Sequence, residues 1–398
     1  MGAPVSDGLR PEPSAMAAEP GLGAVRPDMK GSALHADTVR KVHRMKILSI
    51  VGARPQFVKL APIAHALTLA GHRHVIVHTG QHYDVKMSDV FFADLAIPDP
   101  DVHLGVGSGS HGVQTGAMMA ALDGVLDEHR PDWVLVYGDT NSTIAGALSA
   151  VKMHLPLAHL EAGLRSFNRL MPEEHNRVLT DHAADLCLAP TQTAVDHLTH
   201  EGLGERTVLV GDVMTDVCLS VAATVADTAP RLPEGVDPSR DYLVATIHRA
   251  ENTDDPERLR AVIDALAALP VPVVLLAHPR LVARAATARI DLSAGSLRTT
   301  EPLGYPQMVA AVLHSRGVVT DSGGLQKEAF LLGAPCTTLR TETEWTETVD
   351  LGWNVLRPLV DDLAEVVMRP RPQPTTVAPY GDGRAAEVTV ATLEKHLR

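Results

Sequence analysis

Cysteine is scarce in this sequence, with only Cys187, Cys218 and Cys336 among 398 residues. The three are widely spaced and odd in number, which argues against a disulfide framework or a zinc site. We therefore expect the protein to work in the reducing environment of the cytoplasm.

Long hydrophobic runs are also missing. The longest apolar segments, such as ILSIV and VPVVLLA, fall far short of the roughly 20 residues that a membrane-spanning helix needs. The N-terminal region contains no apolar segment of the kind that a secretory signal requires. The sequence thus predicts a protein that neither crosses a membrane nor is exported.

Basic residues are too few to offset the acidic ones. The chain has 35 lysines and arginines against 48 aspartates and glutamates, a net charge of −13. This balance excludes non-specific binding to nucleic acid, although it permits local basic pockets for an anionic ligand. The sequence also lacks a GxxxxGK[ST] motif and histidine pairs with metal-ligand spacing, so we predict neither ATP hydrolysis nor a bound metal or cofactor.

One stretch, residues 107–112 (GSGSHG), fits the dinucleotide-binding pattern GxGxxG. That pattern requires a strong preceding strand and an acidic residue at the end of the next strand. The preceding segment HLGV is weak, and the next strand ends in YGDT. We therefore interpret residues 107–112 as a flexible loop that opens a helix.

Short β-branched runs alternate with longer amphipathic segments from Lys46 onward. Examples are KILSIV, HVIVHT and WVLVYG, each followed by a predicted helix. This alternation predicts parallel, doubly wound α/β sheets, and it restarts at YLVATIH after a polar, proline-bearing stretch. We expect a disordered tail over residues 1–44, Rossmann-like domains over residues 45–213 and 214–382, and a C-terminal helix over residues 383–398 that packs on the first domain.

Two glycine-containing turns follow predicted strands, where open parallel sheets bind their ligands. In GARP the side chain of Arg54 is placed to meet a phosphate. In TDSGGL the small residues Ser322, Gly323 and Gly324 leave backbone N–H groups free to bind an anion, and Glu328 lies one turn further on. One such turn in each half of the chain suggests a single diphosphate bound by both.

Carboxylates collect at the ends of other strands. Asp139 precedes the helix NSTIAGALSAV, which it could simply cap, and Glu161 ends the strand LPLAHL. Pro172 begins a helix that carries Glu173 in its first turn and Arg177 four residues later, on the same face. A surface ion pair would explain that last pair taken alone. Taken together, these carboxylates beside cationic groups are typical of acid–base chemistry.

Two histidines end strands in the second half of the chain. His248 lies in TIHRAEN and His278 in AHPR. Both are expected to face the same ligand as the TDSGGL turn.

These motifs, in this order, resemble the non-hydrolysing UDP-N-acetylglucosamine 2-epimerase family. The resemblance runs from about Lys46 to Val360 and is carried by the following segments: GARPQFVKLAPI, TGQHYD, YGDTNST, HLEAGLRSFNRLMPEEHNR, VGDVMTDV, TIHRAEN, AHPR, EPLGY, TDSGGLQKEA and ETEWTETVDLGWNVL. It implies a GT-B-like fold in which two Rossmann-like domains close on a UDP-sugar, usually in a homodimer.

The resemblance also implies a mechanism. A base removes the C2 proton of the sugar while UDP leaves C1, and UDP then re-adds as a proton is delivered to the opposite face. The implied acid–base residues are Asp139, Glu161 and Glu173, with Arg177 and His248 assisting the diphosphate. The implied UDP-binding residues are Arg54, Ser322, Gly323, Gly324, Glu328 and His278.

Several positions depart from the family pattern. Gln56 stands where many members have glutamate, and the same version occurs in relatives that act on UDP-2,3-diacetamido-uronates. Members that are activated by a second UDP-GlcNAc carry a Gln-His motif with a further glutamine, and an Arg-Gln-Thr. This chain keeps Gln81 but has Asp84 and Val113 at two other positions. We therefore predict a weak or absent activator site.

Four alternatives to interconversion of UDP-GlcNAc and UDP-ManNAc stay open on the sequence. A 2-epimerase of a UDP-diacetamido-uronic acid would need a further cation for the C6 carboxylate, and Arg165, Arg169 and Arg340 are candidates. A hydrolysing relative would release free ManNAc. A GT-B glycosyltransferase would need an acceptor, and a non-catalytic UDP-sugar-binding protein would not need all of the acid–base positions.

Overall fold

The computed structural model describes residues 44–81 and 97–397. The expectation of a disordered tail over residues 1–44 therefore falls, except for Arg44, outside the described residues. The same is true of Asp84 and of the side chain of Arg54.

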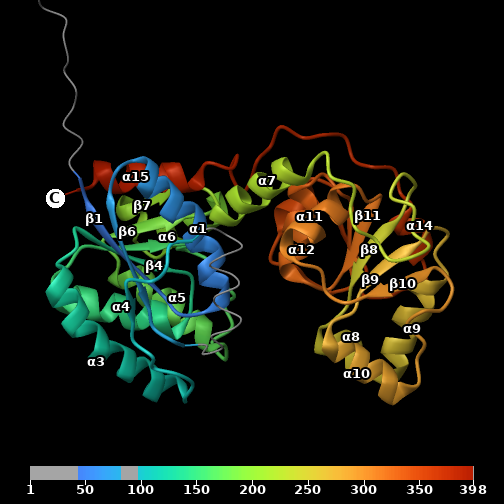
Figure 1. Cartoon of the computed structure of the whole chain (residues 1–398), viewed down its shortest axis with the longest axis horizontal. Coiled ribbons are helices and arrows are strands. Elements are labelled where there is room, and N and C mark those ends of the chain that lie inside the picture. The colour runs from blue at the N-terminus through green and yellow to red at the C-terminus, as the bar shows by residue number, and fades with distance from the viewer. Residues whose placement is uncertain (1–43, 82–96, 398) are drawn as a thin grey trace, which may run out of the picture. The chain divides into compact units, whose positions relative to one another are not determined.

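The described residues form two parallel sheets, as the alternation of strand and helix patterns predicts (Figure 1). The first sheet has the order β3-β2-β1-β4-β5-β6-β7. Its strands are β1 (Lys46–Val51), β2 (Arg73–His78), β3 (Val102–His103), β4 (Trp133–Tyr137), β5 (Leu157–Leu160), β6 (Leu186–Ala189) and β7 (Thr207–Leu209). The associated helices are α1 (Arg54–Leu69), α3 (His111–His129), α4 (Asn141–Lys152), α5 (Pro172–Ala183), α6 (Gln192–His200), α7 (Val213–Val225) and α15 (Ala385–Lys395), with a 3₁₀ turn over Gly204–Arg206.

The second sheet repeats this arrangement with the order β10-β9-β8-β11-β12-β13. Its strands are β8 (Leu243–Thr246), β9 (Val273–Leu276), β10 (Leu297–Thr300), β11 (Gly317–Thr320), β12 (Cys336–Thr338) and β13 (Asn354–Leu356). Its helices are α8 (Ala250–Thr253), α9 (Pro256–Ala267), α10 (Pro279–Ala288), α11 (Tyr305–Leu313), α12 (Gly323–Leu331), α13 (Thr346–Asp350) and α14 (Leu363–Val367).

Local sequence explains where several of these helices begin. Pro55 and Pro172 stand in the first turns of α1 and α5, where a residue without an N–H loses no helical hydrogen bond. Thr140 caps α4 by accepting a hydrogen bond from the Thr143 amide. The rejected dinucleotide motif is confirmed as a loop, because β3 before it has only two residues and α3 begins at His111.

Each sheet buries a hydrophobic core on both faces, because both faces of a parallel sheet are covered by helices. The C-terminal helix α15 belongs to the first of these cores, where Val390 and Leu393 pack with residues of β1, β4 and α1. The Trp133 indole also donates a hydrogen bond to the Leu393 carbonyl at 3.2 Å. Residues more than 250 positions apart in sequence therefore share one core, and Figure 1 shows α15 beside α1.

The strand order creates a switch point in each sheet, where neighbouring strands lead in opposite directions along the sheet. The switch points lie between β1 and β4 and between β8 and β11. Open α/β sheets bind their ligands beyond the carboxyl ends of the strands at these points. The GARP and YGDT segments follow β1 and β4, and the TIHR and TDSGG segments follow β8 and β11.

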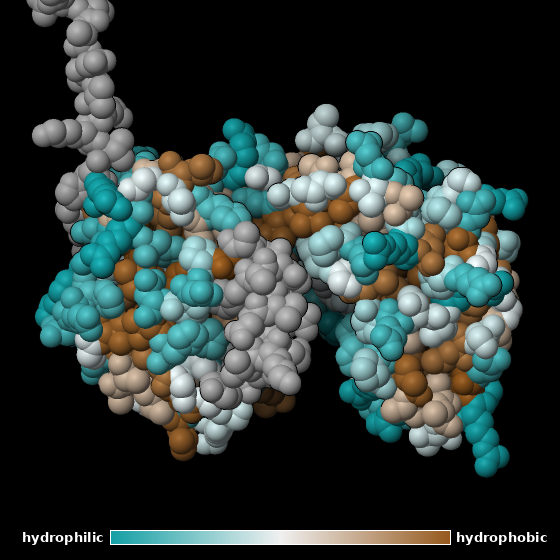
Figure 2. Space-filling view, viewed as in Figure 1, coloured by the Kyte–Doolittle hydropathy of each residue, from teal (hydrophilic) through white to brown (hydrophobic). Residues whose placement is uncertain are grey.

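The outer surface carries mostly polar residues with smaller apolar patches between them on the face shown in Figure 2. Within residues 44–81 and 97–397, no helix combines the length and the hydrophobicity that a membrane span requires. All three cysteines are buried with free thiols.

Candidate active site

Glu161 occupies an unusual backbone position at the end of β5. Its φ of +71° lies in the left-handed region, which a residue with a side chain seldom adopts. Such strain persists only where the surrounding structure fixes it, and it concentrates at functional sites. The carboxylate is paired with the ammonium of Lys59 from α1. Gly138 leaves room for this pair, since a Cβ there would lie 3.0 Å from Glu161 Oε2 and 3.2 Å from Lys59 Nζ.

Lys59 was not among the residues predicted from the sequence. Burial opposes its charge, but the carboxylates of Glu161, Asp139 and Asp212 outweigh this effect and raise the pKa of the ammonium. Lys59 is therefore a fixed cation at the switch point of the first sheet. Its position within the apolar run QFVKLAPIAHAL was the available signal, because a lone lysine on a buried helix face needs a buried anion.

Asp139 does not cap α4, because Thr140 does. The Asp139 carboxylate instead pairs with Arg177 Nη2 of α5 at 2.6 Å, and its backbone carbonyl accepts a hydrogen bond from Asn176 Nδ2 at 2.9 Å. Because the side chain of Asp139 is about a third exposed, it is held in place yet open to a ligand.

The surface ion pair between Arg177 and Glu173, the simpler explanation of their spacing, does not form. Arg177 Nη1 contacts Glu174 Oε2 at 3.0 Å, one residue further along the helix. Glu174 is buried and also accepts hydrogen bonds from Ser166 and from the Phe167 amide, so it anchors the loop before α5. Burial opposes its charge, but these donors lower the pKa of Glu174 overall.

Glu173 thereby remains free for other chemistry. It is half-buried in the first turn of α5, and no hydrogen bond or ion pair joins its side chain to any other described residue. A carboxylate without a fixed partner beside an ordered site can take or give a proton.

In the second sheet, Asp321 organises the switch point. Its fully buried carboxylate accepts hydrogen bonds from the backbone N–H groups of His248 and Arg249 at 3.0–3.1 Å and from Asn252 Nδ2 at 3.1 Å. His248 Nδ1 also lies 3.3 Å from this carboxylate, while 38% of the His248 side chain is exposed. The contact orients the imidazole with its Nε2 edge outward.

His278 lies close to His248, with their ring centroids 5.8 Å apart. It is the residue before α10, and its Nδ1 accepts a hydrogen bond from the Arg280 amide at 3.2 Å. The proton of neutral His278 therefore resides on Nε2. The two predicted histidines are thus brought together.

The TDSGG turn leads directly into α12, which begins at Gly323. Ser322 precedes the helix without capping it, and a Cβ on Gly324 would meet open space. The Trp345 indole donates a hydrogen bond to the Gly323 carbonyl at 2.7 Å, which fixes the turn. A helix N-terminus with small residues around it suits an anion.

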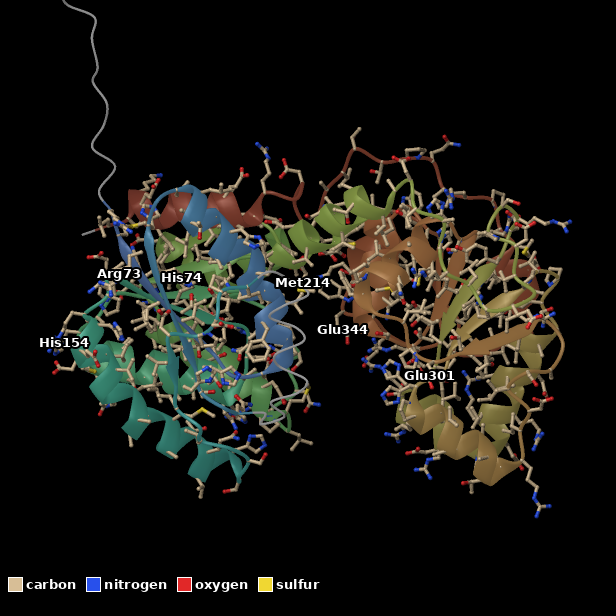
Figure 3. The ribbon with its side chains drawn as sticks, viewed as in Figure 1. Arg73, His74, His154, Met214, Glu301 and Glu344 are labelled. Atoms are coloured by element: carbon tan, nitrogen blue, oxygen red, sulfur yellow. The ribbon has the colours of Figure 1, made fainter. Side chains whose placement is uncertain are left out.

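A carboxylate of the protein already lies beside this turn. Glu344, labelled in Figure 3, contacts Arg340 at 2.8 Å and Arg249 at 3.7 Å, and it is the nearest group to a Cβ built on Gly323. Two arginines therefore share one half-exposed carboxylate near the start of α12.

Glu328 lies on α12, partly buried. Burial raises the pKa of its carboxyl group to about 7, although the Tyr305 hydroxyl and the Lys327 ammonium oppose the rise. The adjacent Lys327 pairs with Asp212, the N-cap of α7, and its ammonium lies 4.4 Å from the centre of the Trp345 ring. Neither Asp212 nor Lys327 was predicted.

The three arginines considered for a sugar carboxylate differ in their surroundings. The side chain of Arg165 is 1% exposed and pairs with Asp181 and Glu201, which contradicts that expectation. Arg340 is paired with Glu344. Arg169 is exposed. Among the described residues, no group of three or more metal-ligating side chains could hold a metal ion.

Two parallel sheets of Rossmann order, each with polar groups at its switch point, define the GT-B-like class of α/β proteins. The calicheamicin glycosyltransferase CalG4 shares this fold with a TM-score of 0.50 at 19% identity, over 89% of this chain and 94% of that one. Residues 66–394 match the family described as UDP-N-acetylglucosamine 2-epimerase. The chain belongs to this family of isomerases, and the resemblance drawn from its motifs is confirmed.

Individual relatives support this family membership. A UDP-2,3-diacetamido-2,3-dideoxy-D-glucuronate 2-epimerase of Pseudomonas aeruginosa is 47% identical over 322 residues, 78% of this chain and 88% of that protein. A UDP-N-acetylglucosamine 2-epimerase of Methanocaldococcus jannaschii is 38% identical over 364 residues, 88% of this chain and 99% of that protein. A solved structure of UDP-GlcNAc 2-epimerase from M. jannaschii superposes with a TM-score of 0.77 at 36% identity, covering 88% and 100% of the two chains. Another has been solved in complex with UDP-GlcNAc and UDP, with a TM-score of 0.70, the same 36% identity and the same coverage.

Proposed function

We propose that this protein catalyses the reversible C2 epimerisation of UDP-GlcNAc to UDP-ManNAc without hydrolysis. The observation that carries the proposal is the pairing of Glu161 with Lys59 and of Asp139 with Arg177 at strand ends of the first sheet, with Glu173 in the first turn of the helix that carries Arg177. Two acid–base groups and fixed positive charge are what an elimination with a diphosphate leaving group requires.

In the proposed reaction a carboxylate takes the proton from C2, and the C–H electron pair forms the C1–C2 double bond. The bond from C1 to the diphosphate oxygen breaks, and UDP leaves with that electron pair as 2-acetamidoglucal forms. UDP then attacks C1 again while a second acid delivers a proton to the opposite face of C2. The sequence of steps consumes no water, oxidant or metal.

We assign the UDP moiety to the second sheet. The N-terminus of α12, with Ser322, Gly323 and Gly324, would bind a phosphate. Glu328 would accept hydrogen bonds from the ribose, and the outward edges of His248 and His278 would contact the diphosphate. In this proposal Arg177 and Arg54 hold the departing group from the first sheet.

A second substrate is favoured by two observations. The P. aeruginosa relative, at 47% identity, is named for a UDP-diacetamido-glucuronate. In addition, Arg340 and Arg249 already hold the carboxylate of Glu344 near Gly323, so a sugar carboxylate could take its place. The alternative is a 2-epimerase for UDP-2,3-diacetamido-uronic acid.

Proton NMR in D₂O tests both substrates. The purified protein is given each UDP-sugar in turn, and the C2 proton and anomeric signals are followed. Formation of UDP-ManNAc with deuterium at C2 supports the main proposal, and exchange with the uronate alone supports the second. Free ManNAc indicates a hydrolysing enzyme, and no exchange from a protein that binds UDP contradicts both proposals.

We further propose that the enzyme works in the cytoplasm as a homodimer, with domains over residues 45–213 and 214–382 and the C-terminal helix attached to the first domain. The three free buried thiols favour a reducing compartment, and the family resemblance favours the dimer. Analytical ultracentrifugation measures the mass, and a monomer at micromolar concentration contradicts the dimer.

A further inference from the structure

A buried ionic network lies directly behind Glu161. Its centre is Asp181 on α5, whose side chain is fully buried. Asp181 Oδ1 lies 2.6 Å from His159 Nδ1, and Oδ2 lies 3.1 Å from the Gly163 amide and 2.7 Å from Arg165 Nη1. The Asp181 carboxylate therefore binds the chain at His159, two residues before Glu161, and at Gly163, two residues after it.

The same network reaches the second candidate carboxylate through His159. Its Nε2 lies 2.7 Å from the carbonyl oxygen of Gly138, the residue directly before Asp139. A carbonyl oxygen can only accept, so Nε2 carries a hydrogen and donates. The imidazole thus connects Asp181 on α5 to the peptide that carries Asp139.

The hydrogen bonds also lead to a prediction about the protonation of His159. Burial opposes ionisation of Asp181, but the pKa of this carboxyl group is lowered overall. The Arg165 guanidinium at 2.7 Å and the Gly163 amide at 3.1 Å both donate to Oδ2, so the carboxylate accepts. With an ionised Asp181 as its partner, His159 Nδ1 donates as well, so this hydrogen-bond geometry predicts a ring that carries a hydrogen on both nitrogens. The nearby Cys187 thiol donates to the Asp181 carbonyl at 3.5 Å and stays neutral, because burial and Asp181 raise its pKa to about 12.

Glu161 needs such support because of its left-handed backbone, with φ at +71°. Its amide and that of Ala162 share the Leu188 carbonyl at 3.1 and 3.2 Å, which fixes the chain on one side only. Strained conformations persist when several contacts determine them together. Asp181 and His159 add contacts to the chain on either side of Glu161, beside the pairing of its carboxylate with Lys59.

We propose that Asp181 and His159 are positioning residues of this active site. The buried Asp181 carboxylate and the buried His159 ring together hold the backbone that carries Glu161 and Asp139. The expected effect on catalysis rests on the proposed function. The protonation of His159 can be tested whether or not that function is correct.

The first experiment measures that charge state in the wild-type protein. Long-range proton–nitrogen spectra of protein labelled with ¹⁵N-histidine are recorded at pH 8.5, where an ordinary histidine, with a pKa near 6.5, is neutral. We expect one ring with two protonated nitrogens, absent from His159→Gln and converted to a neutral ring in Asp181→Asn. A wild-type spectrum in which His159 has a single protonated nitrogen overturns the inference.

The second experiment separates positioning from folding. Asp181→Asn should lower kcat on the order of 10²-fold, the scale of a small misplacement of a catalytic group, with KM and the Kd for UDP within about threefold of wild type. The matched control is Glu201→Gln, because Glu201 shares Arg165 with Asp181 but does not contact His159 or Gly163. The control should keep the wild-type kcat, and a wild-type kcat in Asp181→Asn overturns the positioning role.

Failure of the proposed function can be distinguished from failure of the positioning role. A wild-type protein that exchanges no C2 proton with either UDP-sugar refutes the proposed function and with it the catalytic part of this inference. The histidine spectrum then still shows whether the His159 ring carries a hydrogen on both nitrogens beside Asp181. If Asp181→Asn does not fold, His159→Gln takes its place in the kinetic comparison with the same expected loss.

Discussion

At the scale of single residues, Asp139, Glu161 and Glu173 differ in how tightly they are held. Arg177 pairs with Asp139 and Lys59 pairs with Glu161, while Glu173 has no fixed partner among the described residues. If all three exchange or stabilise protons at C2, then Asp139→Asn, Glu161→Gln and Glu173→Gln should each lower turnover by roughly 10²–10⁴.

The measurement is the rate of deuterium incorporation at C2, together with the Kd for UDP by calorimetry. UDP binding should change little in the three variants, because the nucleotide is assigned to the second sheet. Glu257→Gln on the outer helix α9 serves as the control and should exchange at the wild-type rate. Near-normal turnover in any of the three variants removes that residue from the mechanism.

Gln56 has a structural role that its departure from the family pattern did not reveal. Its Oε1 accepts hydrogen bonds from the Gly52 and Ala53 amides at 2.8 and 3.1 Å. Its Nε2 donates to the Tyr137 carbonyl at 2.9 Å and to Thr143 Oγ1 at 3.1 Å. The glutamine is 1% exposed and joins the β1–α1 turn to the end of β4, so the residue is explained by local hydrogen bonding rather than by the identity of the sugar.

Gln56→Glu should therefore destabilise the protein by about 1–3 kcal/mol, because an ionised carboxylate cannot donate to the Tyr137 carbonyl. Urea denaturation at pH 8 measures the loss. The deficit should shrink at acidic pH, where a protonated glutamate regains one donor. An unchanged urea midpoint at pH 8 contradicts this account of the turn.

At the scale of elements, α12 combines an anion-binding N-terminus with a buried carboxyl group one turn later. The pKa of Glu328 is raised from its ordinary value of 4.5 to about 7, so the folded state binds its proton more tightly than the unfolded state. Between pH 4.5 and 7 the contribution of Glu328 to stability must then fall as the pH rises.

Thermal melting of the wild type and Glu328→Gln tests this expectation. The variant should gain in Tm relative to the wild type as the pH rises from 5 to 8, since it has no charge to bury. It should also lose affinity for UDP if Glu328 binds the ribose. Glu365→Gln on the exposed side of α14 is the control, and an identical pH dependence of Tm in wild type and Glu328→Gln contradicts the assigned shift.

The helix α5 illustrates the limits of reading a helix by spacing. Residues 173 and 174 both lie about one turn from Arg177, so helical periodicity permits either ion pair. The choice of Glu174 follows from the loop before the helix, where Ser166 and Phe167 donate to the same carboxylate. These contacts come from the loop and are not part of the helical period.

At the scale of the whole molecule, the predicted weakness of an activator site can be examined kinetically. Val113 is 71% exposed and apolar. Gln114 Nε2 donates a hydrogen bond to the Gln81 carbonyl, and Gln81 Oε1 accepts hydrogen bonds from the Ser142 amide and hydroxyl. Asp84 lies outside the described residues. The rate should depend hyperbolically on UDP-GlcNAc down to trace concentrations.

The control is a progress curve started from UDP-ManNAc with and without trace UDP-GlcNAc. The two curves should rise without a lag and at the same initial rate. A sigmoidal rate curve, or a lag that trace UDP-GlcNAc removes, contradicts the prediction and implies a second site that binds the sugar nucleotide.

The sequence by itself determined the architecture and the position of the candidate site. Buried β-branched runs alternating with amphipathic helices can pack only as parallel, doubly wound sheets, and the motifs at the strand ends then fall at the two switch points. The tertiary structure alone decided which charges meet. Lys59 and Glu161 are 102 residues apart, and Asp181 serves His159, Gly163 and Arg165 from another element. Such pairs depend on the order of the strands in the sheet and on which side chains exclude water. A local sequence pattern contains neither the strand order nor the packing.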